Sequence, residues 1–156
     1  MKLLGTDVHG ACSFYSVFVP NFPALERSAL PPPPMVVLIA ADALELSVDI
    51  VARVAERFLD AGLGVICAWG TDCERVHDIF DEEYIGDGTI ERDSPMVSTW
   101  HAHESLEDVV EFFAVNGISL LGSETRPVSH LAIAVGNPEW VSAIERVLSP
   151  FALRRS

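Results

Sequence analysis

The chain has 156 residues, 49% of them hydrophobic and 21% charged, a balance typical of one globular domain with a substantial core. Twenty-three acidic residues against ten Lys and Arg give a formal net charge of −13 at pH 7, which disfavours nucleic-acid binding because a phosphate backbone would be repelled. Lys2 is the sole lysine, which excludes a Walker-type phosphate loop, a Schiff-base lysine and the lysine of a phospho-receiver domain.

The same composition bears on where the protein works. No apolar run approaches the ~18–20 residues that a membrane-spanning helix needs. Residues 1–8 carry Lys2 and Asp7 and lack the long apolar core of a secretory signal. Three cysteines, an odd number, suit free thiols in a reducing compartment. We therefore expect a cytoplasmic protein with no membrane partner.

Short apolar runs indicate the strands. Residues 14–19 form the first, and a Pro-rich connector follows it to residue 34. A fully apolar run begins at Met35, which is typical of a strand covered on both faces of a sheet. The strands predicted in the regular part of the chain are residues 35–41, 64–69, 96–100 and 131–135.

Between these strands, apolar residues recur at helical spacing behind residues that favour a helix start. The predicted helix starts are Ser47, a capping box from Thr71 to Glu74, Ser105 and Asn137 with Pro138. Two of the helices are expected over residues 47–61 and 105–116, the second ending near Gly117. These two should bury Val54, Phe58, Val109 and Phe113. The stretch 81–95 is acidic and turn-rich, as in a solvated loop.

Strands that alternate with helices predict crossover connections and a mainly parallel sheet. We therefore expect a single three-layer α/β sandwich over residues 1–156, flavodoxin-like or Rossmann-like in outline. Its regular core would span about 35–149, preceded by an N-terminal strand and Pro-rich connector over 14–34. The first strand is expected to pair at an edge of the sheet.

Two similar junctions, Ala68–Cys73 and Ser98–Ser105, each follow an apolar run and precede a helix. In open α/β sheets, ligands bind at the carboxyl ends of the strands. The polar and aromatic residues at these ends are therefore the candidate binding residues. They are Trp69, Trp100, His103, Glu104, Asp42 and Asn137.

Cys73 suggests a catalytic alternative, because the first turn of a helix stabilises a thiolate. With His101 as base and Asp72 or Glu104 orienting the imidazole, it could serve as the nucleophile of a hydrolase or transferase. The thiol pKa would then be lowered, provided that solvent reaches it. However, Cys73 shares a helix face with Val76 and Phe80, which also fits a buried core thiol.

A metal site is a further alternative. Cys73 and His77 lie one helical turn apart, and His101 and His103 could supply two nitrogen ligands to complete a tetrahedral set. On a strand, residues two apart share a face and adjacent residues do not. Strand geometry therefore limits which of these four side chains could bind the same metal ion. A metal-dependent enzyme would use Asp42, Asp72, His77 and His101. The sequence has no Cys-x-x-Cys and no His-Glu-x-x-His, and no cofactor is expected.

Motifs of common enzymes are absent as well. No Gly-x-Gly-x-x-Gly follows a strand, and there is no Gly-x-Ser-x-Gly elbow. The acidic run Asp78–Tyr84 is typical of a solvated helix face, and it is also typical of a protein that competes for a basic active site. The leading hypothesis is an acidic binding or regulatory protein, inhibitor-like or immunity-like, with a basic protein partner.

Three segments together resemble a family of small uncharacterised bacterial proteins. They are Trp69-Gly70-x-Asp72-Cys73-Glu74-Arg75-Val76-His77-Asp78, then Trp100-His101, then Val135-Gly136-Asn137-Pro138-Glu139-Trp140. The resemblance covers roughly residues 28 to 149. It implies a bacterial origin and one α/β domain, and it supplies no catalytic assignment.

Overall fold

The computed structural model describes residues 1–89, 91–92, 95–122 and 127–153. These residues form one six-stranded sheet with four α-helices and a short 3₁₀ helix, η1 (Phe22–Glu26). The strands are β1 (Lys2–Thr6), β2 (Cys12–Val19), β3 (Met35–Ala40), β4 (Leu63–Trp69), β5 (Val97–His101) and β6 (Val128–Val135). The helices are α1 (Val48–Asp60), α2 (Cys73–Ile85), α3 (Leu106–Leu121) and α4 (Pro138–Leu148).

The sheet has the strand order β1-β2-β6-β3-β4-β5 and is parallel except for the pair β1 and β2. The prediction of an α/β fold with a mainly parallel sheet is therefore confirmed. The prediction that the first strand pairs at an edge needs correction. An unpredicted strand, β1, lies at the edge and covers β2, with Lys2 opposite Ser16 and Thr6 opposite Ser13.

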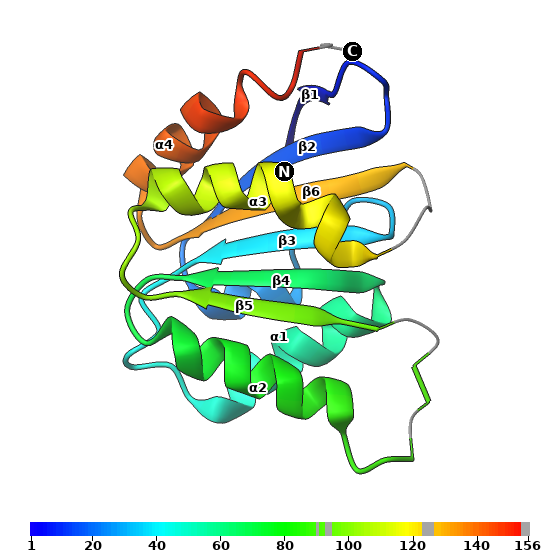
Figure 1. Cartoon of the computed structure of the whole chain (residues 1–156). Helices are drawn as coiled ribbons and strands as arrows, with labels where there is room; N and C mark the ends of the chain where they lie inside the picture. The colour runs from blue at the N-terminus through cyan, green and yellow to red at the C-terminus, as the bar shows by residue number, and fades with distance from the viewer. Residues whose placement is uncertain (90, 93–94, 123–126, 154–156) are drawn as a thin grey trace.

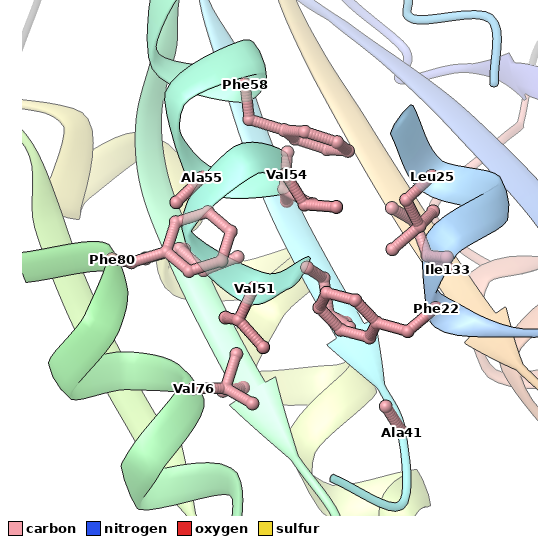
Figure 2. Close-up of a cluster of buried hydrophobic side chains, with 14 of the residues drawn as sticks. Phe22, Leu25, Ala41, Val51, Val54, Ala55, Phe58, Val76, Phe80 and Ile133 are labelled. Atoms are coloured by element: carbon pink, nitrogen blue, oxygen red, sulfur yellow. The ribbon is translucent and has the colours of Figure 1, made fainter. Parts of the chain in front are cut away.

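Helices cover both faces of the sheet. α1, α2 and η1 share one hydrophobic cluster with the sheet, and α3 and α4 share another on the opposite face (Figure 1). In the first cluster, Phe22 of η1, Val54 and Phe58 of α1 and Phe80 of α2 gather above the strands (Figure 2). Every residue of β3 is buried, as the apolar run predicts for a strand covered on both faces.

The direction in which successive strands are added to the sheet reverses at β3. β3, β4 and β5 follow one another across the sheet, and α3 then returns the chain to β6, on the other side of β3. The carboxyl ends of β3 and β6 therefore flank a topological switch point, where the connecting loops diverge to opposite faces. Open α/β sheets leave a crevice for ligands at such a point.

Three predicted helix starts are confirmed. The side chains of Ser47, Ser105 and Asn137 accept hydrogen bonds from the backbone N–H groups of Ile50, Asp108 and Glu139. Residues Val54, Phe58, Val109 and Phe113 are buried as expected. No helix among the described residues is long and apolar enough to cross a bilayer.

Three helix boundaries differ from the prediction. α2 continues to Ile85, into the acidic stretch 81–95 that was predicted as a loop. The capping box from Thr71 to Glu74 does not form, because α2 begins after Asp72, whose side chain makes no capping hydrogen bond. α3 continues past Gly117 to Leu121. A Cβ at Gly117 would lie 2.7 Å from the ring Nε2 of His130, so this glycine allows close packing of α3 on the sheet and does not end the helix.

Candidate functional site

The loops that follow β3 and β4 are joined through their backbones at the carboxyl edge. Ala41 N–H donates to the carbonyl of Trp69 (3.0 Å), and Ala43 N–H donates to that of Thr71 (2.9 Å). Gly70 lies where they meet, with φ +115°, and a Cβ there would come within 2.1 Å of the Ala41 carbonyl oxygen. Only glycine allows this close approach, which makes the two loops a single rigid wall.

Arg75 reinforces this wall from the first turns of α2. Its Nε lies 2.6 Å from Oδ2 of Asp72, and its Nη1 donates to the carbonyl of Leu46 (2.9 Å). The Nη2 group donates to the carbonyl of Ala43. The guanidinium thus forms an ion pair with the Asp72 carboxylate and links Asp72 to the loop after β3. Asp72 itself adopts a left-handed backbone conformation, with φ 58°.

Two indole rings meet beside this wall. Trp69, the last residue of β4, donates its Nε1–H to the carbonyl of Glu104 (2.9 Å). Its ring contacts that of Trp140 edge to face, with centroids 5.3 Å apart. The Asn137 cap, together with Pro138, begins α4 just before Trp140 and so brings this ring to the carboxyl edge.

Glu104 also anchors the loop after β5. Its Oε1 lies 3.0 Å from Nδ1 of His101, and this hydrogen bond lowers the pKa of the Glu104 carboxyl. The Nε2 of His101 is 3.0 Å from the hydroxyl of Thr99. The imidazole therefore holds the loop and has no ring nitrogen left for a substrate.

Two adjoining hollows open along this edge. The larger, about 500 Å³, is lined by Asp42, Trp69, Gly70, Thr71, Asp72, Ala102, Glu104 and Trp140. The smaller, about 350 Å³, is lined by Asn21, Phe22, Asp42, Leu46, Val135, Gly136, Asn137 and Trp140. Asp42 and Trp140 belong to both hollows. The smaller one lies at the switch point between β3 and β6, and the larger one extends from it toward β5.

The groups of the nucleophile hypothesis are not brought together. Cys73 is buried in the cluster on the α1 and α2 face, whereas the His101 ring packs on Phe112 of α3, with centroids 4.9 Å apart on the opposite face. Burial raises the pKa of the Cys73 thiol and outweighs opposing hydrogen bonds from backbone groups, including that of His101. The lowered thiol pKa of the catalytic hypothesis, which required solvent access, is therefore not found.

The metal hypothesis also lacks an assembled ligand set. His77 lies on the α2 face, where its Nδ1 is 2.9 Å from Asp78 and its ring packs against Trp100 at 4.5 Å. His101 occupies the other face. Among the described residues, no group of three or more His, Cys, Asp and Glu side chains is placed to hold a metal ion.

The sequence matches the family described as a domain of unknown function (DUF7684) over residues 17–150. The chain belongs to this family. A search of curated proteins found no match. The DUF7684 region contains every residue that lines the two hollows, whereas β1 and most of β2 precede it.

Most of the predicted binding residues line the hollows of the DUF7684 region. Trp69, Asp42, Asn137 and Glu104 do so, and Asp72 joins them. Trp100 and His103 line neither hollow. Trp100 is 45% exposed on the α2 face, and His103 is exposed in the loop after β5.

Trp140 was not among the predicted binding residues, although it lines both hollows. The signal that could have identified it is its spacing from the predicted cap. Asn137 and Pro138 place it in the first turn of a helix that begins at the carboxyl edge. Phe22 and Leu46 were also missed, because the 3₁₀ helix η1 and the loop after β3 carry no periodic pattern.

Proposed function

We propose that this protein is a small acidic binding or regulatory protein that acts through contact with a basic protein, in the manner of an inhibitor or immunity protein. The observation that carries the proposal is the pair of adjoining hollows that share Asp42 and Trp140 at the carboxyl edge. Trp69 and Trp140, which line the larger hollow, are half-buried, and Trp is enriched among the residues that dominate affinity in protein recognition.

Charge supports a basic partner. The chain carries a formal charge of −13, and the larger hollow alone has three carboxylates, those of Asp42, Asp72 and Glu104. Such a surface attracts positive charge and speeds the diffusional encounter with a basic protein. The same surface repels nucleic acid.

The arrangement of the polar groups favours binding over catalysis. The Cys73 thiol and the His101 imidazole face opposite sides of the sheet, and the Asp72 carboxylate is paired with Arg75. A thiol nucleophile needs a base within hydrogen-bond reach. The hydrolase or transferase alternative would therefore require a rearrangement of β5.

The wider setting of the proposal follows from the fold and the thiols. We propose a Rossmann-like outline, because β5-β4-β3-β6 is the order 3-2-1-4 when β3 is counted first. We also propose a cytoplasmic location, since Cys67 and Cys73 are free thiols and are buried, as suits a reducing compartment. A bacterial origin is proposed on the resemblance alone.

The test starts from a defined partner, chosen as the product of a neighbouring gene or as a protein captured on the immobilised chain. That partner is purified and titrated by calorimetry against the wild-type protein, Trp140→Ala and Glu56→Gln, each first checked for folding by circular dichroism. Glu56 is exposed on α1, outside both hollows, and serves as the control.

We expect a basic partner whose affinity falls as salt rises from about 50 mM to about 300 mM, because screening weakens charge attraction. Trp140→Ala should weaken binding at least about tenfold, as loss of a hot-spot residue does. Glu56→Gln should bind like the wild type. Binding that is insensitive to both salt and Trp140→Ala would contradict the proposal.

A further inference from the structure

The larger hollow combines aromatic rings with negative charge. Trp69 and Trp140 line it, together with the carboxylates of Asp42, Asp72 and Glu104. An indole ring attracts a cation through the negative charge of its face, and Trp does so better than Tyr or Phe. Aromatic rings and carboxylates in one hollow are therefore complementary to a cation that also has a flat apolar surface.

The three carboxylates differ in what they already bind. Asp72 is paired with the guanidinium of Arg75, and Glu104 is hydrogen-bonded to His101. Asp42 accepts a hydrogen bond from the backbone N–H of Leu44 (3.2 Å) and forms no ion pair within the described ranges. Asp42 is thus the carboxylate of the hollow that is left for an incoming cation.

We propose that this hollow receives an arginine side chain of the basic protein partner, with its guanidinium paired to Asp42 and packed against Trp140. The inference rests on the proposed function and specifies the group that is recognised. A guanidinium suits the site better than an ammonium, because it is planar, weakly hydrated and able to stack on an aromatic ring while its N–H groups bind a carboxylate.

The walls of the hollow are fixed before any partner binds. The indole N–H of Trp69 is bonded to Glu104, and Gly70 holds the loop of β4 against Ala41. The Asn137 cap sets the start of the helix that carries Trp140. A preformed site costs little conformational entropy on binding, so even a single arginine should bind measurably.

The experiment uses N-acetyl-L-argininamide as the probe and follows the ¹⁵N-labelled wild-type chain by NMR. N-acetyl-L-norleucinamide, which has a similar apolar length and no charge, is the control ligand. The protein variants are Asp42→Asn, Trp140→Leu and the control Glu56→Gln. Asp42→Asn removes the charge and keeps the oxygen that accepts from Leu44.

Supporting results are saturable shifts at the indole N–H of Trp140 and the backbone N–H of Asp42, with no comparable response to the norleucine probe. Asp42→Asn should weaken the arginine probe about two- to fivefold, as expected for a partly exposed ion pair. Trp140→Leu should weaken it further, and Glu56→Gln should leave it unchanged. Each variant is compared only if its spectrum shows the native dispersion.

Two results would overturn the inference. One is equal binding of the arginine and norleucine probes, and the other is a response that Asp42→Asn leaves intact. If the purified partner still bound the edge in a salt-dependent manner that Trp140→Ala disrupts, the proposed function would stand and only the arginine assignment would fail. If the arginine probe bound as expected while the partner ignored the edge, the proposed function would fail.

Discussion

Lowering the pH from 7 to 5 is expected to destabilise the folded protein through one buried histidine, His130 of β6. The ring is fully buried, and neither of its nitrogens has a hydrogen-bond partner among the described residues. It lies between the rings of Phe14 and Phe113, with centroids 5.0 and 5.2 Å away. Burial lowers the pKa of His130 from 6.5 to about 4 and outweighs the opposing charge of Asp7.

The direction of the effect follows from where the proton binds. Because the pKa of folded His130 lies below that of the unfolded chain, the unfolded chain takes up more protons between pH 6.5 and about 4. The contribution that neutral His130 makes to the free energy of unfolding is therefore fully present above pH 6.5 and is lost as the pH falls toward 4. The lost stability is about 2 kcal/mol at pH 5 and about 3 kcal/mol at pH 4.

The assay is urea unfolding followed by circular dichroism at several pH values between 7 and 5. His130→Leu removes the titrating ring and keeps an apolar side chain of similar size. Its free energy of unfolding at pH 7 should equal or exceed that of the wild type, because two unsatisfied polar atoms are lost. Its further loss on going to pH 5 should be smaller than that of the wild type by about 2 kcal/mol.

The control for this experiment is His9→Leu, which removes an exposed histidine from the turn between β1 and β2. This variant should follow the pH dependence of the wild type. If His130→Leu and the wild type lost stability in parallel between pH 7 and 5, His130 would have to be protonated in the folded state or accessible to water. The reasoning from burial would then be refuted.

β2 to β6 could all be predicted from short apolar runs, most clearly the strands that are buried on both faces. β3 and β4 are continuous apolar runs and β6 is one from Leu131 to Val135, a pattern that depends on local sequence alone. β1 could not be predicted in this way. It is short, half exposed and interrupted by an irregular register between Leu3 and Gly5. It also makes long-range contacts that local sequence does not reveal, such as the ion pair between Lys2 and Glu145 of α4.

The carboxyl edge was predictable as a place, because strand ends of a parallel sheet meet there. Which side chains share a face was not. Alternation along β5 places Trp100 and His101 on opposite faces, but sequence alone does not say which helix covers which face. In the structure, Trp100 contacts His77 of α2 and His101 contacts Phe112 of α3. Because the two helices cover opposite faces of the sheet, the imidazole of His101 is separated from Cys73.

The failed capping box at Thr71 has a similar cause. Its spacing is correct for a local motif, but the neighbouring loop after β3 imposes another geometry. Gly70 must approach Ala41 closely, and Arg75 binds the carbonyls of Ala43 and Leu46 in that loop. Tertiary contacts therefore override the local preference at the same point where they build the wall of the hollow.

Three further measurements test the packing. Phe113→Ala should lower the free energy of unfolding by about 3–5 kcal/mol, since the ring is fully buried, and a loss under about 1 kcal/mol would contradict that burial. Iodoacetamide at pH 7 should leave Cys73 unlabelled until the protein unfolds, because burial raises its thiol pKa, and rapid labelling of Cys73 alone would favour the hydrolase alternative. Gly70→Ala should cost about 2 kcal/mol or more, because φ +115° suits glycine and the new methyl group would collide with Ala41. Gly88→Ala is the control, because Gly88 has φ +81° but open space around it, and it should cost only about 1 kcal/mol. If urea unfolding showed the same loss of free energy for both variants, the loops after β3 and β4 would separate readily and would not form a fixed wall.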